Sequence, residues 1–475
     1  MRWFPNATVC LIAWGVLAFG AEYPWAYVPL LIFAATIGTL GLAAPTAGRS
    51  EVRPLLVPFA LVLAAVGVQL IPLPDPVLAV LSPARLVHDW PALVAATVPA
   101  APGAEPAAAG GAWPLSINPA RTLLGAAFLA GLALFFAGTC RALAVVRASA
   151  VVRGVVAVGL LVALIAIAQA TSDSPRVYGF WWPRKIESTP AAPLINENHL
   201  AGWLLMALSM AGAYLCSGFA DGGLGGRVGW RRGVRWLASR EGSITLLAGL
   251  SAFVIAVAVI VTGSVSGIAG FLVVCFVLSR CLTRRARDAP VPRLVRVLLI
   301  ALPVAAITWV GFDVVGEEVA AASWSDIGGR LPIWRDTLSI VRDFAVTGTG
   351  WNTYGIAMLA YQAGRPGVHV VEAHSDYLQL AAEGGILVGA PVLLAVFVFV
   401  RQVRTRFRDA ADDIRIHSLR VGAVAGLLAL AVQSLVDFSL QMPGNAVLFT
   451  LLMAIAVHRA PPRVHVHEGS RTTCG

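Results

Sequence analysis

The chain has 475 residues, of which 58% are hydrophobic and 13% are charged, and its mean hydropathy is +0.78. Such a composition excludes a soluble globular protein, because the surface would aggregate in water, and it indicates a polytopic membrane protein. The net charge of +10 does not indicate nucleic-acid binding, since most arginines lie in short loops between apolar stretches. Basic loops of this kind encode membrane orientation.

Twelve apolar stretches approach the roughly 20 residues that a helix needs to cross the hydrocarbon core. In chain order they are Ala7–Ala21, Tyr27–Ala44, Leu55–Ile71, Thr122–Thr139, Val152–Ala170, Leu200–Phe219, Ile244–Thr262, Gly267–Leu282, Leu294–Phe312, Gly385–Val400, Val421–Phe438 and Met442–Val457. The predicted fold is therefore all-α, with about twelve transmembrane helices. The first stretch follows Arg2 like a signal sequence, but no clean small-residue cleavage site follows it, and we expect it to be retained.

The distribution of arginine over the loops predicts the orientation. Arginines follow every second span: Arg49, Arg53, Arg141, Arg147, Arg153, five between Arg227 and Arg240, four between Arg284 and Arg293, and five between Arg401 and Arg415. Because basic loops tend to stay inside, we expect these loops and both termini to face the cytoplasm. No charged residue interrupts the centre of a predicted span, which argues against an ion pathway through the bundle.

Four regions follow from this topology. Residues 1–312 hold the first nine spans, with outer loops at 72–121 and 171–197, and residues 313–384 form a large, partly helical outer segment. Residues 385–459 hold the last three spans, and residues 460–475 form a cytoplasmic tail. Within the first outer loop, residues 95–111 are largely Ala, Pro and Gly and are expected to lack fixed structure.

The second outer loop combines aromatic rings with cations. It contains Tyr178, Phe180, Trp181, Trp182, Arg184 and Lys185. One interpretation is an interfacial aromatic belt with snorkelling cations. The other is a ligand surface, with rings for sugar faces and Arg184 for phosphate. The polar run Asn196-Glu197-Asn198-His199 then begins the next span, where helix capping and a binding site are both reasonable.

The large outer segment carries cations on the side where arginine is normally scarce. They are Arg330, Arg335, Arg342, Arg365, His369 and His374. Leu331, Trp334, Leu338 and Val341 recur at helical spacing, so an amphipathic helix is predicted to rest on the membrane surface or the bundle. His374 is expected at the start of the following helix. Arginines placed against the charge bias indicate an anionic ligand, which at a membrane surface suggests a lipid-linked phosphate.

Four segments together resemble the O-antigen ligase and O-antigen polymerase superfamily. They are GRLPIWRDTLSIVRDFAVTGTGWNTY (329–354), EAHSDYLQLAAEGGILVG (372–389), NENHLAGWL (196–204) and TGSVSG (262–267). Each segment alone is a weak signal, whereas the two-part signature of the large outer segment is fairly specific as a set. The resemblance covers roughly Asn196 to Gly389, and the number of spans fits the rest of the chain.

The resemblance implies a multi-pass glycosyltransferase of the C type in the bacterial inner membrane, surrounded by membrane lipids. Such an enzyme transfers glycan from undecaprenyl diphosphate to a glycan, lipid A-core or protein acceptor on the periplasmic side. The reaction is inverting and uses no metal or other cofactor. Arg330 is implied to bind the donor diphosphate and His374 to act as a base or to position the acceptor, so both are the predicted catalytic residues. Residues predicted to contact acceptor or glycan are Trp334, Tyr377, Asn198, His199 and Glu197.

One departure from the family pattern concerns the donor site. Many members carry arginine in a Ser-Arg-Gly turn between spans seven and eight, whereas this chain has Val265 in Ser264-Val265-Ser266-Gly267. We expect Arg184, Arg176 or Arg335 to replace the missing diphosphate contact.

Three functions compete at this point. The first is polymerisation of O-antigen, capsule or exopolysaccharide repeat units, and the second is ligation of finished glycan. The third is transport or flipping of lipid-linked oligosaccharide, which typically requires internal repeats or helices broken at mid-membrane. Neither feature is recognisable in the sequence, so glycosyl transfer is favoured, and the altered turn at Val265 favours polymerase slightly over ligase.

Overall fold

The computed structural model describes residues 1–45, 53–97, 112–172, 174–183, 191–221, 230–284, 329–362, 369–409 and 414–459. Almost all regular structure in these ranges is helical, as predicted. The exception is one short antiparallel pair, β1 (Pro72–Pro74) with β2 (Ala112–Pro114), in which Leu73 lies opposite Trp113. This pair joins the two ends of the first predicted outer loop.

Seven helices of the described ranges are long and apolar enough to cross a membrane. They are α2 (Pro24–Leu42), α7 (Pro119–Ala142), α8 (Ala148–Ala170), α9 (Glu197–Asp221), α11 (Arg240–Val261), α16 (Asp376–Phe407) and α17 (Ile414–Gln433). Four shorter apolar helices accompany them: α1 (Phe4–Leu17), α3 (Arg53–Val68), α12 (Val265–Arg284) and α18 (Pro443–Val457). Eleven predicted spans thus coincide with helices, Leu294–Phe312 lies outside the described residues, and the chain is a multi-pass membrane protein.

Helix α9 is the centre of the bundle, because its whole apolar window is buried inside the protein. It packs against α8, α11, α12 and α17. Lipid tails are as apolar as leucine, so close approach of helices depends on small residues rather than on hydrophobic burial. A side-chain carbon on Gly422 or Gly426 of α17 would meet α9 at Ser209, and one on Gly138 of α7 would meet the backbone of Gly38 on α2.

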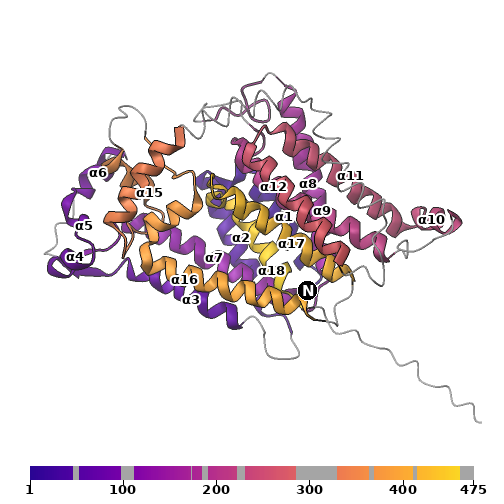
Figure 1. Cartoon of the computed structure of the whole chain (residues 1–475), viewed down its shortest axis with the longest axis horizontal. Helices are drawn as coiled ribbons and strands as arrows, with labels where there is room; N and C mark the ends of the chain where they lie inside the picture. Colours follow the sequence, from indigo (N-terminus) through magenta and orange to yellow (C-terminus); the bar gives the residue numbers. More distant parts are fainter. Residues whose placement is uncertain are drawn as a thin grey trace, which may run out of the picture.

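A separate helical layer covers one end of the bundle (Figure 1). We call it the cap; it consists of α4 (Asp75–Leu81), α5 (Ala84–Val87), α6 (Trp90–Thr97), the helical residues 329–343 and α15 (Tyr354–Tyr361). Trp90, Ile340, Phe344 and Tyr354 are buried in its apolar cluster. The cap therefore has a core of its own, built from the first and the large predicted outer segments.

The cap core also encloses Arg85. Its Nε donates to the carbonyl of Pro114 at 3.3 Å, and its guanidinium lies 5.7 Å from the centre of the Trp113 ring. Burial lowers the pKa of Arg85. Because Arg85 packs within the cap, it contributes to the fold rather than to an open anion site.

Helix α16 is broken at Gly385, where φ is +54°, although the sequence indicated no broken helix. The backbone of the turn after residues 329–343 fills this break: Ile386 N donates to the carbonyl of Ala345, and Leu387 N donates to that of Val346, both at 2.9 Å. Gly348, with φ +66°, lies directly against the backbone of Glu383. The break falls at the tenth of the 32 residues of α16, and only glycine fits both closely apposed positions.

Gln69, at the end of α3, ties this turn to α16. Its Nε2 donates to the carbonyls of Thr347 and Glu383, both at 2.8 Å, and its Oε1 accepts the N–H of Trp351 at 3.0 Å. The Gln69 side chain is fully buried, so water cannot reach these groups, and each would lack a hydrogen-bond partner without these bonds. Three chain segments distant in sequence meet at this one amide.

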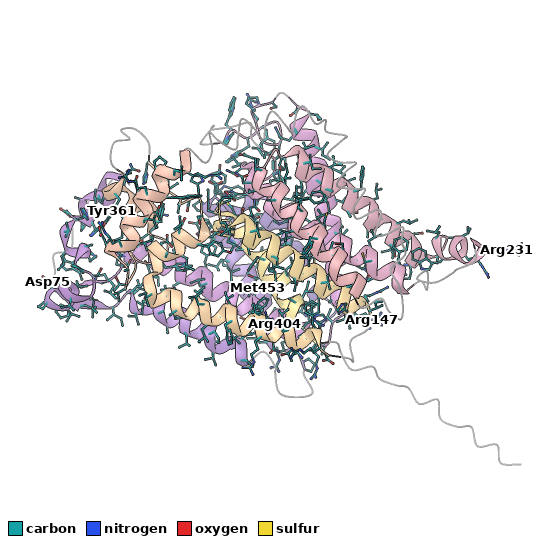
Figure 2. All side chains as sticks on the ribbon, viewed as in Figure 1. Asp75, Arg147, Arg231, Tyr361, Arg404 and Met453 are labelled. Carbon is teal, nitrogen blue, oxygen red and sulfur yellow. The ribbon has the colours of Figure 1, made fainter. Side chains whose placement is uncertain are left out.

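The opposite end of the bundle contains buried arginines. Arg420 on α17 is fully buried and donates to the carbonyls of Ala456 and His458, while Arg406 on α16 donates to that of Val457. Cations complement the partial negative charge at a helix C-terminus, so the two arginines fix the end of α18. Arg147, Arg231 and Arg404 lie toward this end, and Asp75 and Tyr361 lie at the cap (Figure 2).

Replacing Gln69 tests the tie between α3 and α16. Gln69→Leu removes three buried hydrogen bonds, each worth about 1 kcal/mol, and leaves their partners unsatisfied, so unfolding should become easier by about 2–4 kcal/mol. Thermal unfolding of the detergent-solubilised protein measures this. As a control, Thr39→Val removes only the exposed bond to Ala35 and should leave the transition unchanged. Equal stability of both variants would contradict the role assigned to Gln69.

Candidate functional site

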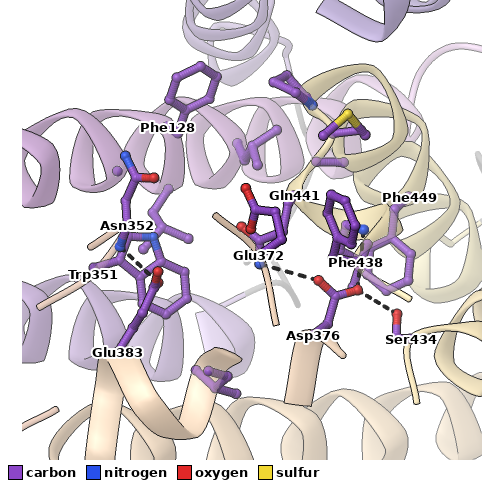
Figure 3. Close-up of a pocket in the computed structure, with 18 of the residues that line it drawn as sticks. Phe128, Trp351, Asn352, Glu372, Asp376, Glu383, Ser434, Phe438, Gln441 and Phe449 are labelled. Carbon is purple, nitrogen blue, oxygen red and sulfur yellow. Dashed lines mark hydrogen bonds between the residues drawn. The ribbon is translucent and has the colours of Figure 1, made fainter. Parts of the chain in front are cut away.

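A cavity of about 1160 Å³ lies between the cap and the ends of α2, α7, α16, α17 and α18 (Figure 3). Ligand cavities commonly measure about 300–1,000 Å³, so this one has room for a long molecule. Its lining divides into an apolar part between the helices and a polar part beneath the cap. The two parts present different chemistry to a ligand.

The apolar part is built by α7, α16, α17 and α18. Its walls include Phe128, Leu132, Val396, Phe399, Leu428 and Phe449. On α16 the lining residues Leu393 and Val396 are 71% and 54% exposed, so this wall is not covered by other described helices. Side chains this exposed on a membrane-spanning helix would meet the lipid that surrounds the bundle.

The polar part is organised around Asp376, the first residue of α16. Its carboxylate accepts hydrogen bonds from Ser434 Oγ at 2.7 Å, Gln441 Nε2 at 3.2 Å and Leu440 N at 3.3 Å (Figure 3). Its N–H donates to the carbonyls of Ser434 and Asp437. Ser375 accepts the N–H of Leu378 and caps the helix. The start of α16 is thus held by the turn between α17 and α18.

Two histidines flank Phe438 in this turn. The ring centres of His199 and Phe438 are 4.5 Å apart and those of His374 and Phe438 are 5.1 Å apart, both in edge-to-face geometry. His374 has a left-handed backbone, with φ +49°, which is uncommon outside glycine and is often found at functional sites. The neighbouring Ala373 carbonyl accepts a hydrogen bond from Trp334 Nε1 at 3.0 Å. Both histidines line the cavity, and their rings are fixed by one shared aromatic neighbour.

His199 lies at the base of the polar part. It is 3% exposed, and its Nε2 is 3.9 Å from Asp437 Oδ2, which also accepts the hydroxyl of Ser439. Asn196 Oδ1 accepts the N–H of His199, and Asn445 donates to its carbonyl at 3.0 Å. Asn196 and Asn445 thus hold the backbone of His199, while Asp437 and Phe438 lie beside its ring.

A second carboxylate of α16 in the cavity lining, that of Glu383, faces the cap. Its oxygens accept the N–H groups of Asn352 at 2.8 Å and Tyr354 at 3.0 Å (Figure 3). Tyr354 in turn shares a hydrogen bond of 2.6 Å with Thr337, and burial raises the pKa of Tyr354, so its hydroxyl stays neutral. Glu383 therefore ties α16 to the start of α15.

A second chamber of about 310 Å³ adjoins the large cavity on this side. Eight of its eleven lining residues have polar side chains; the lining consists of Asn118, Arg121, Asn352, Tyr354, Gly355, Ile356, His369, Val371, Glu372, Gln379 and Glu383. Six of these residues also line the large cavity: Arg121, Asn352, His369, Val371, Glu372 and Glu383. The two spaces therefore share one wall.

Three of the predicted site residues line the large cavity: His374, His199 and Tyr377. Tyr377 also donates its hydroxyl to the carbonyl of Ala431. Trp334 is beside the cavity through its bond to Ala373, and Arg330 lies one helical turn before Trp334, outside the described lining. These assignments remain predictions.

The remaining predicted residues lie away from this lining. Arg176 stacks on Trp182 at 4.9 Å from the ring centre, and Arg335 is exposed on the cap. Arg184 and Arg365 lie outside the described residues. Glu197 does not line the cavity, and Asn198 Oδ1 instead accepts the hydroxyl of Ser264 at 2.6 Å. That bond closes the turn containing Val265.

Several lining residues were not predicted from the sequence. They are Arg121, Asn352, Glu372, Asp376, Glu383, Ser434 and Gln441. Glu383 gave a usable signal, because a carboxylate beside a long apolar run is costly without a specific partner. Asp376 follows a plausible N-cap, Ser375, and therefore looked like an ordinary residue of a first helical turn.

The described lining has an unexpected charge balance. It contains the carboxylates Glu22, Glu372, Asp376 and Glu383 but only one guanidinium, that of Arg121. Two of the carboxylates, Asp376 and Glu383, are engaged by hydrogen-bond donors of the protein itself. The one guanidinium in the described lining belongs to Arg121 of α7, which the sequence did not single out.

Comparison with known proteins bears on the same residues. The family model Wzy_C, described as O-antigen ligase, matches residues 250–393. The matched segment includes Val265, Arg330, His374, Asp376 and Glu383. No curated protein matches the chain. The match of residues 250–393 thus supports an assignment of this multi-pass membrane protein to the O-antigen ligase and polymerase family.

Proposed function

We propose that the protein transfers glycan from undecaprenyl diphosphate to an acceptor hydroxyl beneath the cap. The observation that carries this proposal is the division of the large cavity. An apolar groove open toward lipid suits a polyprenyl chain, and an adjoining polar part suits the diphosphate and its sugar. The O-antigen ligase domain supports a lipid-linked glycan as the substrate class.

The proposed chemistry is a single displacement at the anomeric carbon. The acceptor oxygen forms the new bond as the bond from the anomeric carbon to the diphosphate oxygen breaks, and the electron pair leaves with the diphosphate. This displacement inverts the anomeric configuration. His374, in the lining of the cavity, takes the proton of the acceptor hydroxyl, a form of assistance typically worth about 10²–10⁴-fold. Arginine stabilises the charge that develops on the leaving group, without a metal.

The proposed topology places the cap in the periplasm and both termini in the cytoplasm. Arg147, Arg231 and Arg404, from three basic loops, lie away from the cap, in agreement with the tendency of such loops to stay inside (Figure 2). The site would then face the periplasmic side of the bacterial inner membrane, where lipid-linked glycan and acceptor meet. The altered turn at Val265 favours a polymerase of repeat units over a ligase.

Substitution of His374 tests the proposed proton acceptor. His374→Ala should lower glycan transfer by about 10²–10⁴-fold while the protein still inserts, because the acceptor hydroxyl loses its proton acceptor. Transfer is measured in membranes with lipid-linked glycan as donor. His88→Ala is the matched control, since His88 belongs to the cap but not to the cavity lining, and it should retain activity. Full activity of His374→Ala would overturn the assignment.

Substitution of Arg330 tests the implied diphosphate contact. Arg330→Ala should abolish transfer, because loss of a charged hydrogen-bond donor leaves the leaving group less stabilised in the transition state. The comparison is Arg342→Ala on the same helix, whose side chain is 78% exposed and paired with Asp343 at 2.9 Å. That variant should behave like the unaltered protein in the same assay. Equal activity of the two variants would remove Arg330 from the mechanism.

Chelation tests the proposed metal independence. If arginine alone neutralises the leaving diphosphate, excess chelator should leave transfer in purified membranes unchanged. The rate of transfer is measured before and after chelator, and again after Mg²⁺ or Mn²⁺ is added. A strong loss restored by either cation would count against the metal-free route.

A further inference from the structure

The residues shared by the large cavity and the polar chamber mark a junction between two chemical environments. On one side the walls are mainly apolar and open toward lipid, and on the other they are amides, a tyrosine and carboxylates. The shared wall contains Arg121, which is the only guanidinium in the described lining of either space. The guanidinium of Arg121 therefore borders both spaces.

Arg121 is held at this junction by its backbone. It is the third residue of α7, and its N–H donates to Asn118 Oδ1 at 3.0 Å, which caps the helix. Its carbonyl accepts Asn352 Nδ2 at 3.2 Å, which joins the start of α7 to the turn before α15. The side chain is exposed to the cavities, and within the described ranges no hydrogen bond or ion pair involves its guanidinium. The guanidinium of Arg121 is therefore placed and charged to bind an anionic ligand.

The neighbouring carboxylates do not neutralise this guanidinium through a direct contact. Glu383 directs its oxygens to the backbone N–H groups of Asn352 and Tyr354 and to Gln379 Nε2 at 3.4 Å. Its carboxylate is thus used to hold the cap against α16. An anion placed between the two spaces would meet Arg121 together with the polar amide of Asn352.

We propose that Arg121 binds the phosphate of the lipid-linked donor, with the polyprenyl chain in the large cavity and the first sugar in the polar chamber. The inference rests on the proposed function and deepens it. A polyprenyl-diphosphate sugar presents an apolar chain, then negative charge, then hydroxyl groups, which is the order of the two spaces and their junction. Arg121 would supply the contact that the turn lacks at Val265.

The guanidinium would act on the leaving group. It donates two parallel hydrogen bonds to phosphate oxygens and stabilises the negative charge that grows as the anomeric bond breaks. The sugar in the chamber is met by the amides of Asn118, Asn352 and Gln379, whose donors and acceptors suit hydroxyl groups.

Binding and kinetics of Arg121 variants test this inference. Hydrogen bonds to a charged partner are worth about 1.5–3 kcal/mol, which corresponds to roughly 10–100-fold in affinity. Arg121→Ala should weaken binding of short-chain polyprenyl diphosphate by that factor, followed through tryptophan fluorescence, since Trp351 lines the cavity. Binding of the uncharged polyprenol should not change. Arg121→Lys should recover part of the loss, and Arg342→Ala should bind like the unaltered protein.

Transfer kinetics of the same variants distinguish an effect on donor binding from an effect on acceptor binding. In the transfer assay Arg121→Ala should raise the KM for donor, or lower donor kcat/KM, by about 10–100-fold and leave the acceptor KM unchanged. A change confined to the acceptor KM would assign the phosphate to the acceptor and overturn the proposal, as would unchanged binding of polyprenyl diphosphate. Polyprenyl diphosphate that carries its first sugar should bind more tightly than polyprenyl diphosphate alone, both to the unaltered protein and to Arg121→Ala. Equal affinity for the two ligands would show that the chamber does not bind the sugar.

The binding assay does not require transfer to occur. Binding of the donor by an unaltered protein that transfers no glycan would therefore refute the proposed function and leave the role of Arg121 intact.

Discussion

Helix α16 leaves helical geometry at Gly385, and the backbone of residues 345–350 occupies the space that this break creates. The carbonyls of Ala345 and Val346 take the N–H groups of Ile386 and Leu387, so the break leaves no donor unsatisfied at this point. Gln69 completes the arrangement from α3. The cap, α3 and α16 are thereby held as one unit, and the cavity beneath the cap has walls from all three. The positions of Trp351, Asn352 and Glu383 around the ligand space depend on this crossing.

The start of α16 is fixed in a complementary way. Asp376 draws together Ser434, Leu440 and Gln441 from the turn between α17 and α18, and Phe438 in that turn holds the rings of His199 and His374. A carboxylate on α16 thus determines where the predicted base lies. The left-handed backbone of His374 lies where the chain passes from the cap to α16, two residues before Asp376, which is bonded to Ser434.

Local properties of the sequence predicted the helices well, because length and hydropathy are read within a single segment. Eleven of the twelve expected spans coincide with described helices, and His374, His199 and Tyr377 line the cavity. The partners of Asp376 lie 58 and 65 residues away, at Ser434 and Gln441, and no local pattern reveals such pairing. The break at Gly385 depends on a turn from another segment. Arg121 resembled an ordinary arginine at a membrane boundary, since its importance arises from a junction built by α7, α15 and α16.

Helices α1 and α18 have 14 and 15 residues, and they pack with Gly15 against Gly444. At 1.5 Å per residue they are about 21–23 Å long, whereas the hydrocarbon core of a typical bilayer is about 30 Å thick. Where helices this short meet lipid, thinning of the bilayer is one way to relieve the hydrophobic mismatch. Gln441 and Met442 precede α18 and line the cavity, so thinning around this pair would fall beside the polar part of the site. The lipid headgroup plane would then dip toward the site, and a lipid-linked donor could enter sideways with its charged group never leaving the interface.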